Sequence, residues 1–144
     1  MATFNKVNDF VEAVAHKLHD LETDQLVIAL SNTAPASETS DPSATGNGVL
    51  ANVTQIAYTN LSSRNITTTS SAEASGTYKL TLTDLVLTAS GGAVADFRYV
   101  YVYNDTATND ELIGYYDYGS TVSLADGDTF TIDFDASGGF ITLA

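Results

Sequence analysis

The chain has 144 residues, of which 44% are hydrophobic, and this length is typical of one domain that buries a core of its own. It contains no cysteine, which excludes disulfides, thiolate metal sites and thiol nucleophiles. Eighteen Asp and Glu residues against five Lys and Arg residues give a net charge of −13, which repels phosphate backbones and argues against binding of nucleic acid.

The opening residues, MATFNKVNDF, lack the basic region and apolar run of a secretory signal. The longest apolar runs are also too short to cross a membrane. We therefore expect folding in a cytoplasm and no membrane partner. In the simplest interpretation the acidic charge keeps the protein soluble, but it also suits a basic protein partner or divalent cations.

Apolar residues recur at helical spacing over residues 4–21, and they predict one N-terminal amphipathic α-helix. Thr3 is the expected N-cap. Because the stripe is short, packing against a sheet is favoured over a coiled coil. The stripe consists of Phe4, Val7, Val11, Val14, Leu18 and Leu21, and it is broadened by Phe10, Ala13 and Ala15.

The next part of the chain alternates short strand signals with long polar segments. Gln25–Leu30 reads as a strand, and Val53–Thr59 as a second, shorter one. Residues 31–52, which hold both prolines, and residues 60–76 are expected to be extended polar arms or loops, the second of them with an edge strand. The first arm is either a mobile loop or a segment ordered by another chain, and we expect it to be mobile in the free subunit and ordered on assembly.

Residues 77–144 are expected to form the β core. Tyr78–Ala89 has the composition of a long strand, but its apolar positions change parity near Thr83 and Asp84, which predicts a bulge or a break. Two further strands follow the tyrosine-rich region. They are predicted to form a tight hairpin that places Leu124 opposite Phe130, and residues 140–143 form the last strand.

The densest strand signal lies between Phe97 and Phe134. Residues 97–104 and 111–118 are predicted to pair as a hairpin with Asn104 opposite Glu111. This register places Arg98 directly opposite Asp117 and Gly114 beneath Tyr101. One face then carries Phe97, Tyr99, Tyr101, Tyr103, Leu112, Tyr116 and Tyr118, and the other carries Val100, Val102, Ile113 and Tyr115.

Both faces of this hairpin are apolar, so we expect it in the interior of a sheet and not at an edge. Together the elements predict a mainly β protein, an antiparallel β-sandwich of about seven or eight strands with one N-terminal α-helix. The chain is expected to fold as a single domain over residues 1–144.

Three groups of side chains are candidates for a site. His16 and His19 lie near Glu12 and Asp20, a set that can hold a metal, but no HExxH pattern is present and solvated or capping histidines are the simpler interpretation. The tyrosine row can stack on sugars or form core. The aspartate pairs can bind Ca²⁺, act as glycosidase carboxylates or point outward from a strand; they are Asp126, Asp128, Asp133 and Asp135.

We interpret each group in the simpler way and predict no catalytic, cofactor-binding or metal-binding residue. The sequence has no G-x-S-x-G motif, no Gly-rich phosphate loop and no Cys/His pair. An enzymatic function is therefore not expected.

Several stretches of the chain resemble a family of small structural proteins of tailed bacteriophages. They are FNKVNDFVEAVAHKLHDL, LVIALSNTAP, FRYVYVYNDTATNDELIGYYDYG and DGDTFTIDFD, and the resemblance is weakest from Ala36 to Gly76. It implies a virion component and carries over no catalytic residue.

We therefore expect a capsid decoration (cement) protein, assembled in the host cytoplasm, that binds the phage major capsid protein and copies of itself as a homo-oligomer. Polar arms that become ordered across neighbours suit such multivalent contact. Two alternatives stay open at this point: a tail or neck component, and a glycan-binding module that uses the tyrosine face for host attachment.

Overall fold

The computed structural model describes residues 2–35 and 48–144. Within these ranges the protein is mainly β, with nine strands in antiparallel sheets and one α-helix, as predicted. The strands are β1 (Phe4–Lys6), β2 (Leu26–Ser31), β3 (Thr68–Ala74), β4 (Thr77–Leu82), β5 (Leu85–Thr88), β6 (Val94–Asn104), β7 (Leu112–Leu124), β8 (Thr129–Ile132) and β9 (Ile141–Leu143); α1 spans Asp9–Ala15, and the 3₁₀-helix η1 spans Leu50–Asn52.

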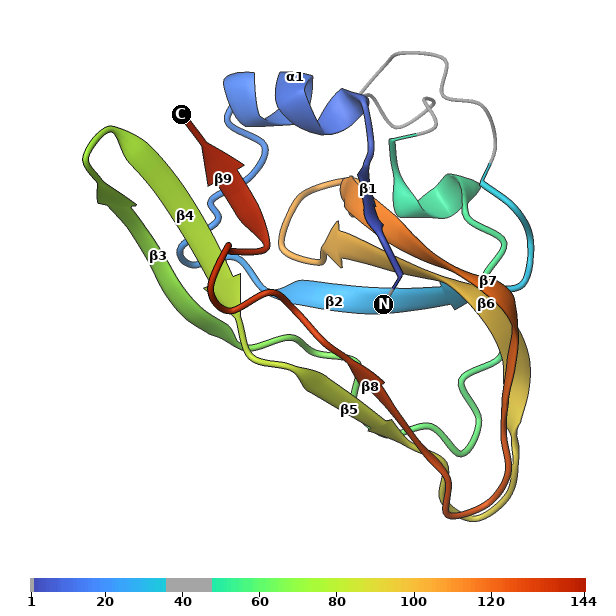
Figure 1. Ribbon diagram of the computed structural model, residues 1–144. Helices are drawn as coiled ribbons and strands as arrows, with labels where there is room; N and C mark the ends of the chain where they lie inside the picture. The colour runs from blue at the N-terminus through green and yellow to red at the C-terminus, as the bar shows by residue number, and fades with distance from the viewer. Residues whose placement is uncertain (1, 36–47) are drawn as a thin grey trace.

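The strands form two layers that face each other across the main core (Figure 1). One layer is a four-stranded sheet in the order β1-β7-β6-β2. The other combines the β3-β4-β9 sheet with the β5-β8 pair, because β4 leads directly into β5. Ile28 and Val100 from the first layer meet Leu80 and Ile132 from the second, so the arrangement is sandwich-like.

The outer face of the four-stranded sheet is buried as well. Tyr101 and Tyr103 are each 4% exposed and belong to a second apolar cluster with Ala29. Leu50 and Val53, from the segment that follows β2, pack against this cluster. Since β6 and β7 are also the two central strands of the sheet, the predicted interior position of the hairpin is confirmed.

The register of the β6–β7 hairpin agrees with the prediction only next to its turn. There the amide of Asn104 donates to the carbonyl of Glu111 at 2.9 Å. Ile113 then forms a bulge, so that Val102 pairs with Gly114. From this point the pairing is one residue away from the predicted register.

The bulge exchanges the faces of two tyrosines, because one extra residue turns every later side chain to the opposite side of the strand. Tyr115 now lies opposite Tyr101 on the outer face, whereas Tyr116 lies in the main core. The predicted position of Gly114 beneath Tyr101 is also wrong. The ring of Phe4, from β1, covers Gly114 instead.

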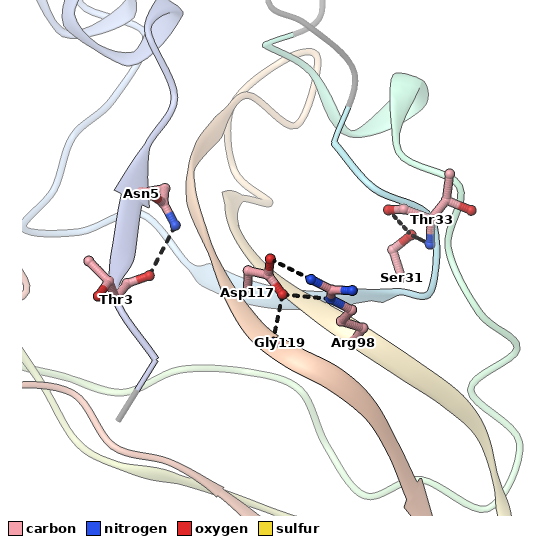
Figure 2. A network of polar contacts seen from close by, with 7 residues as sticks. All are labelled: Thr3, Asn5, Ser31, Thr33, Arg98, Asp117 and Gly119. Carbon is pink, nitrogen blue, oxygen red and sulfur yellow. Dashed lines mark hydrogen bonds and ion pairs between the residues drawn. The ribbon is translucent and has the colours of Figure 1, made fainter.

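Arg98 and Asp117 form the predicted ion pair but do not lie directly opposite each other. The cross-strand partner of Asp117 is Tyr99, because the ladder between β6 and β7 is irregular here. Figure 2 shows how the two side chains nevertheless meet: Nε of Arg98 donates to Oδ1 of Asp117 at 2.7 Å, and Nη2 donates to Oδ2 at 3.0 Å. The predicted contact is thus confirmed, and the predicted direct opposition is wrong.

The single N-terminal helix is shorter than predicted and buries only part of the predicted stripe. The predicted range of residues 4–21 divides into β1, which pairs with β7, and α1, which spans only Asp9–Ala15. Phe10 and Ala13 are each 1% exposed, whereas Val11 is 55% exposed. Pairing with β7 is favoured at Phe4–Lys6 because it satisfies backbone groups at the edge of the sheet.

Helix α1 lies over one end of the sandwich (Figure 1). Phe10 reaches from α1 into the main core and packs against the ring of His19, at 5.3 Å between ring centroids. Thr3, the predicted N-cap, lies before β1, and Asn8 occupies the N-cap position without a side-chain capping bond. The helix therefore covers its own subunit, although Val11 of the predicted stripe is exposed.

The predicted break at Thr83 and Asp84 is confirmed, because it separates β4 from β5. Oδ1 of Asp84 accepts the backbone N–H of Phe134 at 2.9 Å. This hydrogen bond joins the break between β4 and β5 to the segment that follows β8. The predicted hairpin that placed Leu124 opposite Phe130 is wrong. Strand β8 pairs with β5 instead, because Phe130 and Ile132 face Leu87 and Leu85 there.

The two polar segments take different roles. Part of the first, residues 36–47, lies outside the described residues. The predicted strand over residues 53–59 is absent from the described secondary structure, and residues 56–66 instead run along the outer edge of β2. There Ile56 donates to Leu30 and Ile28 donates to Arg64, each at 3.0 Å between backbone atoms. The edge strand predicted within residues 60–76 is β3.

Candidate functional site

The two histidines and the two acidic residues predicted beside them do not converge on one point. Nδ1 of His16 lies 3.7 Å from a carboxylate oxygen of Glu12, and both side chains are exposed. His19 lies beyond the end of the helix against Phe10. Asp20 accepts backbone N–H groups of the turn that follows it. In the described residues no group of three or more His, Asp or Glu side chains is placed to hold a metal ion.

The four C-terminal aspartates mainly stabilise turns. Asp126 and Asp128 each accept one backbone N–H at 2.9 Å. Asp135 accepts the N–H of Gly138 at 2.7 Å, and this bond, with those from Ser137, lowers the pKa of Asp135. Asp133 is exposed. This arrangement agrees with the outward-pointing interpretation, since the carboxylates serve separate loops.

Most of the tyrosine row is core. Tyr99, Tyr101 and Tyr103 are 7%, 4% and 4% exposed, and burial raises the pKa of Tyr101 well above its ordinary value. Tyr115 and Tyr118 are half-buried, Tyr115 against the second cluster and Tyr118 against the main core. The rings at the centre of the row are thus not accessible for stacking on a sugar.

A buried polar cluster, which the sequence analysis missed, joins the segment after α1 to the β6–β7 turn. Asn104, at the end of β6, is fully buried. Its Oδ1 accepts the backbone N–H groups of Thr106 and Ala107 at 3.0 and 3.1 Å. Its Nδ2 donates to Oδ2 of Asp24 at 2.6 Å and lies 3.1 Å from Nδ1 of His19.

The hydrogen bonds of Asn104 assign the protonation of His19. Because Nδ2 of Asn104 donates, Nδ1 of His19 accepts, and the proton of the neutral ring is on Nε2. Burial lowers the pKa of His19, while the negative charges of Glu111 and Asp24 oppose this shift. Glu111 is only 1% exposed and accepts two hydrogen bonds from Asn109. The cluster holds the His19 segment on the turn.

A local signal for this cluster does exist in the sequence. Asn104 follows an apolar strand and precedes Asp105 and Thr106, a setting in which an asparagine side chain often closes a turn. The register also placed Glu111 opposite Asn104. Only the burial of both residues was unforeseeable, because it depends on the His19 segment, which is distant in sequence.

Most carboxylates of the protein have no cationic partner. Among the described residues, Arg98–Asp117 is the only contact within 4.0 Å that joins Lys or Arg to Asp or Glu. Other cations bind backbone carbonyls: Lys79 donates to Ser137 at 3.1 Å, and Arg64 donates to Ile28. The negative charge is therefore largely uncompensated within the chain.

A shallow groove of about 380 Å³ lies between residues 17–22 and the β3-β4-β9 sheet; we call it the connector groove. Leu21, Tyr78 and Leu143 give it an apolar lining, and the carboxylates Asp20 and Glu22 and the cation Lys17 also line it. An apolar groove with carboxylates beside it is suited to a side chain that combines an aliphatic stem with a positive charge.

Comparisons with protein-family models, with curated proteins and with solved structures find no match. No helix in residues 2–35 and 48–144 is long and apolar enough to span a membrane. The features that bear on function are therefore those of the surface: uncompensated carboxylates, exposed strand edges and the connector groove.

Proposed function

We propose that this protein is a bacteriophage virion structural protein that decorates the capsid and stabilises the head through multivalent, non-covalent contacts. In this proposal it has no catalytic role. Its partners are the major capsid protein and further copies of itself, and its location is the assembled virion.

The observation that carries the proposal is the uncompensated negative charge on a two-layer β scaffold. The 18 Asp and Glu residues of the chain face only five Lys and Arg residues, and one such ion pair forms among the described residues. Charge of this kind favours a basic protein surface and disfavours nucleic acid. A decoration protein needs a stable module whose charges are free to meet a partner.

The resemblance noted in the sequence supports the same proposal. Its stretches at residues 4–21, 26–35 and 97–119 contribute β1, α1, β2 and most of the β6–β7 hairpin. These elements include every strand of the four-stranded sheet. The fourth stretch, residues 126–135, contains β8, which lies in the other layer, so the resemblance extends to both layers.

Burial of the tyrosine row bears on the glycan-binding alternative. An aromatic platform requires accessible rings, but Tyr101 and Tyr103 are each 4% exposed. No comparable observation favours a tail or neck location over the capsid. We therefore propose the capsid as the location, and the copy number in the virion distinguishes it from a tail or neck location.

Copy number in purified particles tests the proposal. The protein should be present on the order of hundreds of copies, as expected for a subunit bound at symmetry-related positions over a whole shell. Quantitative mass spectrometry against the major capsid protein measures this ratio. A handful of copies per particle would instead indicate a tail or neck component, and absence from washed particles would contradict a virion role.

A further inference from the structure

The sheet edges of this protein are not equally protected. The outer edge of β2 is covered by residues 56–66, and the edge of β5 receives a backbone bond from Ser62 to Thr88 at 3.0 Å. Strands β1 and β9 are only three residues long. In contrast, β3 is seven residues long, its side chains are largely exposed, and in the described part of the chain only β4 pairs with it.

The turn geometry determines which backbone groups of β3 face outward. Ser75 and Gly76 both have positive φ, 53° and 83°, which is typical of a two-residue hairpin loop. Such a loop is closed by a hydrogen-bonded pair, here Ala74 and Thr77, and paired residues then alternate along the ladder. The N–H and C=O groups of Ser71 and Glu73 therefore point away from β4.

A bond on the other side of β4 agrees with this assignment. Leu80 pairs with Ser71, and its carbonyl accepts the N–H of Phe140, on the side away from β3, at 2.8 Å. Leu80 thus directs its backbone groups toward β9, as the alternation requires. Its partner Ser71 must direct its own toward the open edge.

The usual protections of an edge strand are absent from most of β3. Proteins guard such edges with Lys, Pro, bulges or covering loops. Thr68–Ala74 contains neither Lys nor Pro, and its one irregularity lies at the start, between Thr68 and Ser70. The only charged residue, Glu73, turns back to accept the N–H of Gly76 at 2.6 Å.

The surroundings of this edge select a basic partner. Ser71 lines the connector groove, whose lining includes the carboxylates of Asp20 and Glu22 together with one cation, Lys17. A residue opposite Glu73 on an added strand lies on the same face as Glu73. A second copy of this chain, with a net charge of −13, would bring further negative charge to this surface, whereas Lys or Arg would meet an opposite charge.

We propose that the edge of β3 binds an extended, Lys- or Arg-bearing segment of another protein, which adds to the sheet as a new strand. The backbone groups of Ser71 and Glu73 supply the hydrogen bonds, and the carboxylates of the connector groove select the charge. The inference goes beyond the virion assignment, because it concerns the chemistry of the segment and not its source.

A defined peptide tests the proposal by NMR on the full-length, ¹⁵N-labelled protein. The probe is an acetylated and amidated heptapeptide that alternates Lys and Thr, and its counterpart has Glu in place of Lys. The Lys peptide should shift the amide resonances of Ser71 and Glu73 and slow their hydrogen exchange. The Glu peptide should have no such effect.

Two variants of Ser71 separate the backbone donor from the side chain. Ser71→Pro removes an outward N–H, which an edge strand tolerates, and should weaken binding of the Lys peptide by about tenfold. Ser71→Ala loses only the hydroxyl contact to Tyr78 and should bind like the wild type. A spectrum of each free variant verifies its fold.

The following results would overturn the proposal: no change at Ser71 and Glu73 with millimolar Lys peptide, equal binding of both peptides, or unchanged binding by a folded Ser71→Pro variant. The comparison of the two peptides uses the wild type and stays decisive if the proline variant fails to fold. Protection of the same amides in a peptide-free dimer would show that a second copy occupies the edge. Copy number in the virion is independent of all these outcomes.

Discussion

Arg98 and Asp117 hold β6 and β7 together through two hydrogen bonds although neither residue is the direct cross-strand partner of the other. The ladder is regular from Val102–Gly114 to Tyr99–Asp117 and is next paired at Phe97–Val122, so β7 contains extra residues between these last two pairs. Oδ1 of Asp117 also accepts the N–H of Gly119 in this irregular stretch. The carboxylate of Asp117 thus binds both the guanidinium of Arg98 on β6 and the backbone of the irregular stretch of β7.

Asp117→Asn should lower the unfolding temperature at pH 7 but not at about pH 2. The hydrogen bond from Arg98 lowers the pKa of Asp117 below that of an unfolded aspartate, about 3.9. The pair therefore contributes stability above the unfolded pKa and loses it as the pH falls through the folded pKa. Thermal unfolding of both proteins at the two pH values measures this.

Asp133→Asn, which removes an exposed carboxylate elsewhere, is the control for the loss of negative charge. If Asp117→Asn lowered the unfolding temperature equally at both pH values, the charge of the carboxylate would not be the cause, and the ion pair would not explain the effect.

The phase of α1 predicts opposite results for two adjacent substitutions. Phe10→Ala removes a ring that is 1% exposed and should cost about 3–5 kcal/mol in the free energy of unfolding. Val11→Ala changes a side chain that is 55% exposed and should alter this free energy by about 0.5 kcal/mol or less. Denaturant unfolding followed by circular dichroism distinguishes them. A larger cost at Val11 would restore the originally predicted stripe.

Gly114→Ala should displace β1 from β7. A Cβ atom at this position would lie 2.3 Å from the ring of Phe4 and 2.6 Å from the backbone carbonyl of Asn5. Overpacking of this kind costs about 1–3 kcal/mol. Hydrogen exchange of residues 4–6 should become faster in the variant.

Ser120→Ala, on an exposed part of the same strand, is the matched control and should leave that exchange unchanged. Wild-type protection of residues 4–6 in Gly114→Ala would mean that β1 does not depend on the missing side chain.

His19 should make the protein less stable in mild acid. Burial lowers the pKa of His19, so the folded state favours the neutral ring, and stability falls as the pH decreases below the unfolded value of about 6.5. His19→Gln should reduce the difference in unfolding temperature between pH 7.5 and pH 5.5. His16→Gln, at an exposed position, should leave that difference as it is. Identical pH profiles for the wild type and His19→Gln would refute the assignment.

Local signals were sufficient for much of the fold. The apolar composition of residues 26–30 predicts β2, the parity change at Thr83 and Asp84 predicts the break before β5, and Asn104 lies opposite Glu111 as the hairpin match requires. Each of these features depends on residues that are close in sequence or on a single pair of strands.

Features that depend on a third element were not predictable in this way. The bulge at Ile113 lies next to Gly114, which pairs with β1. The sequences of β6 and β7 alone do not indicate this bulge. The spacing of apolar residues in the N-terminal segment predicts a helix that includes Phe4. Instead, Phe4–Lys6 pair with the edge of β7 and form a strand. The cluster at Asn104 likewise requires the His19 segment to fold over the turn.

A cryo-EM map of the intact particle tests the central claim most directly. The account predicts density for this two-layer sandwich at symmetry-related positions on the outside of the capsid, with carboxylates of the protein facing Lys or Arg of the shell. Density for the sandwich only at the neck or tail would contradict the capsid assignment, and a fully accounted map without it would contradict a structural role in the virion.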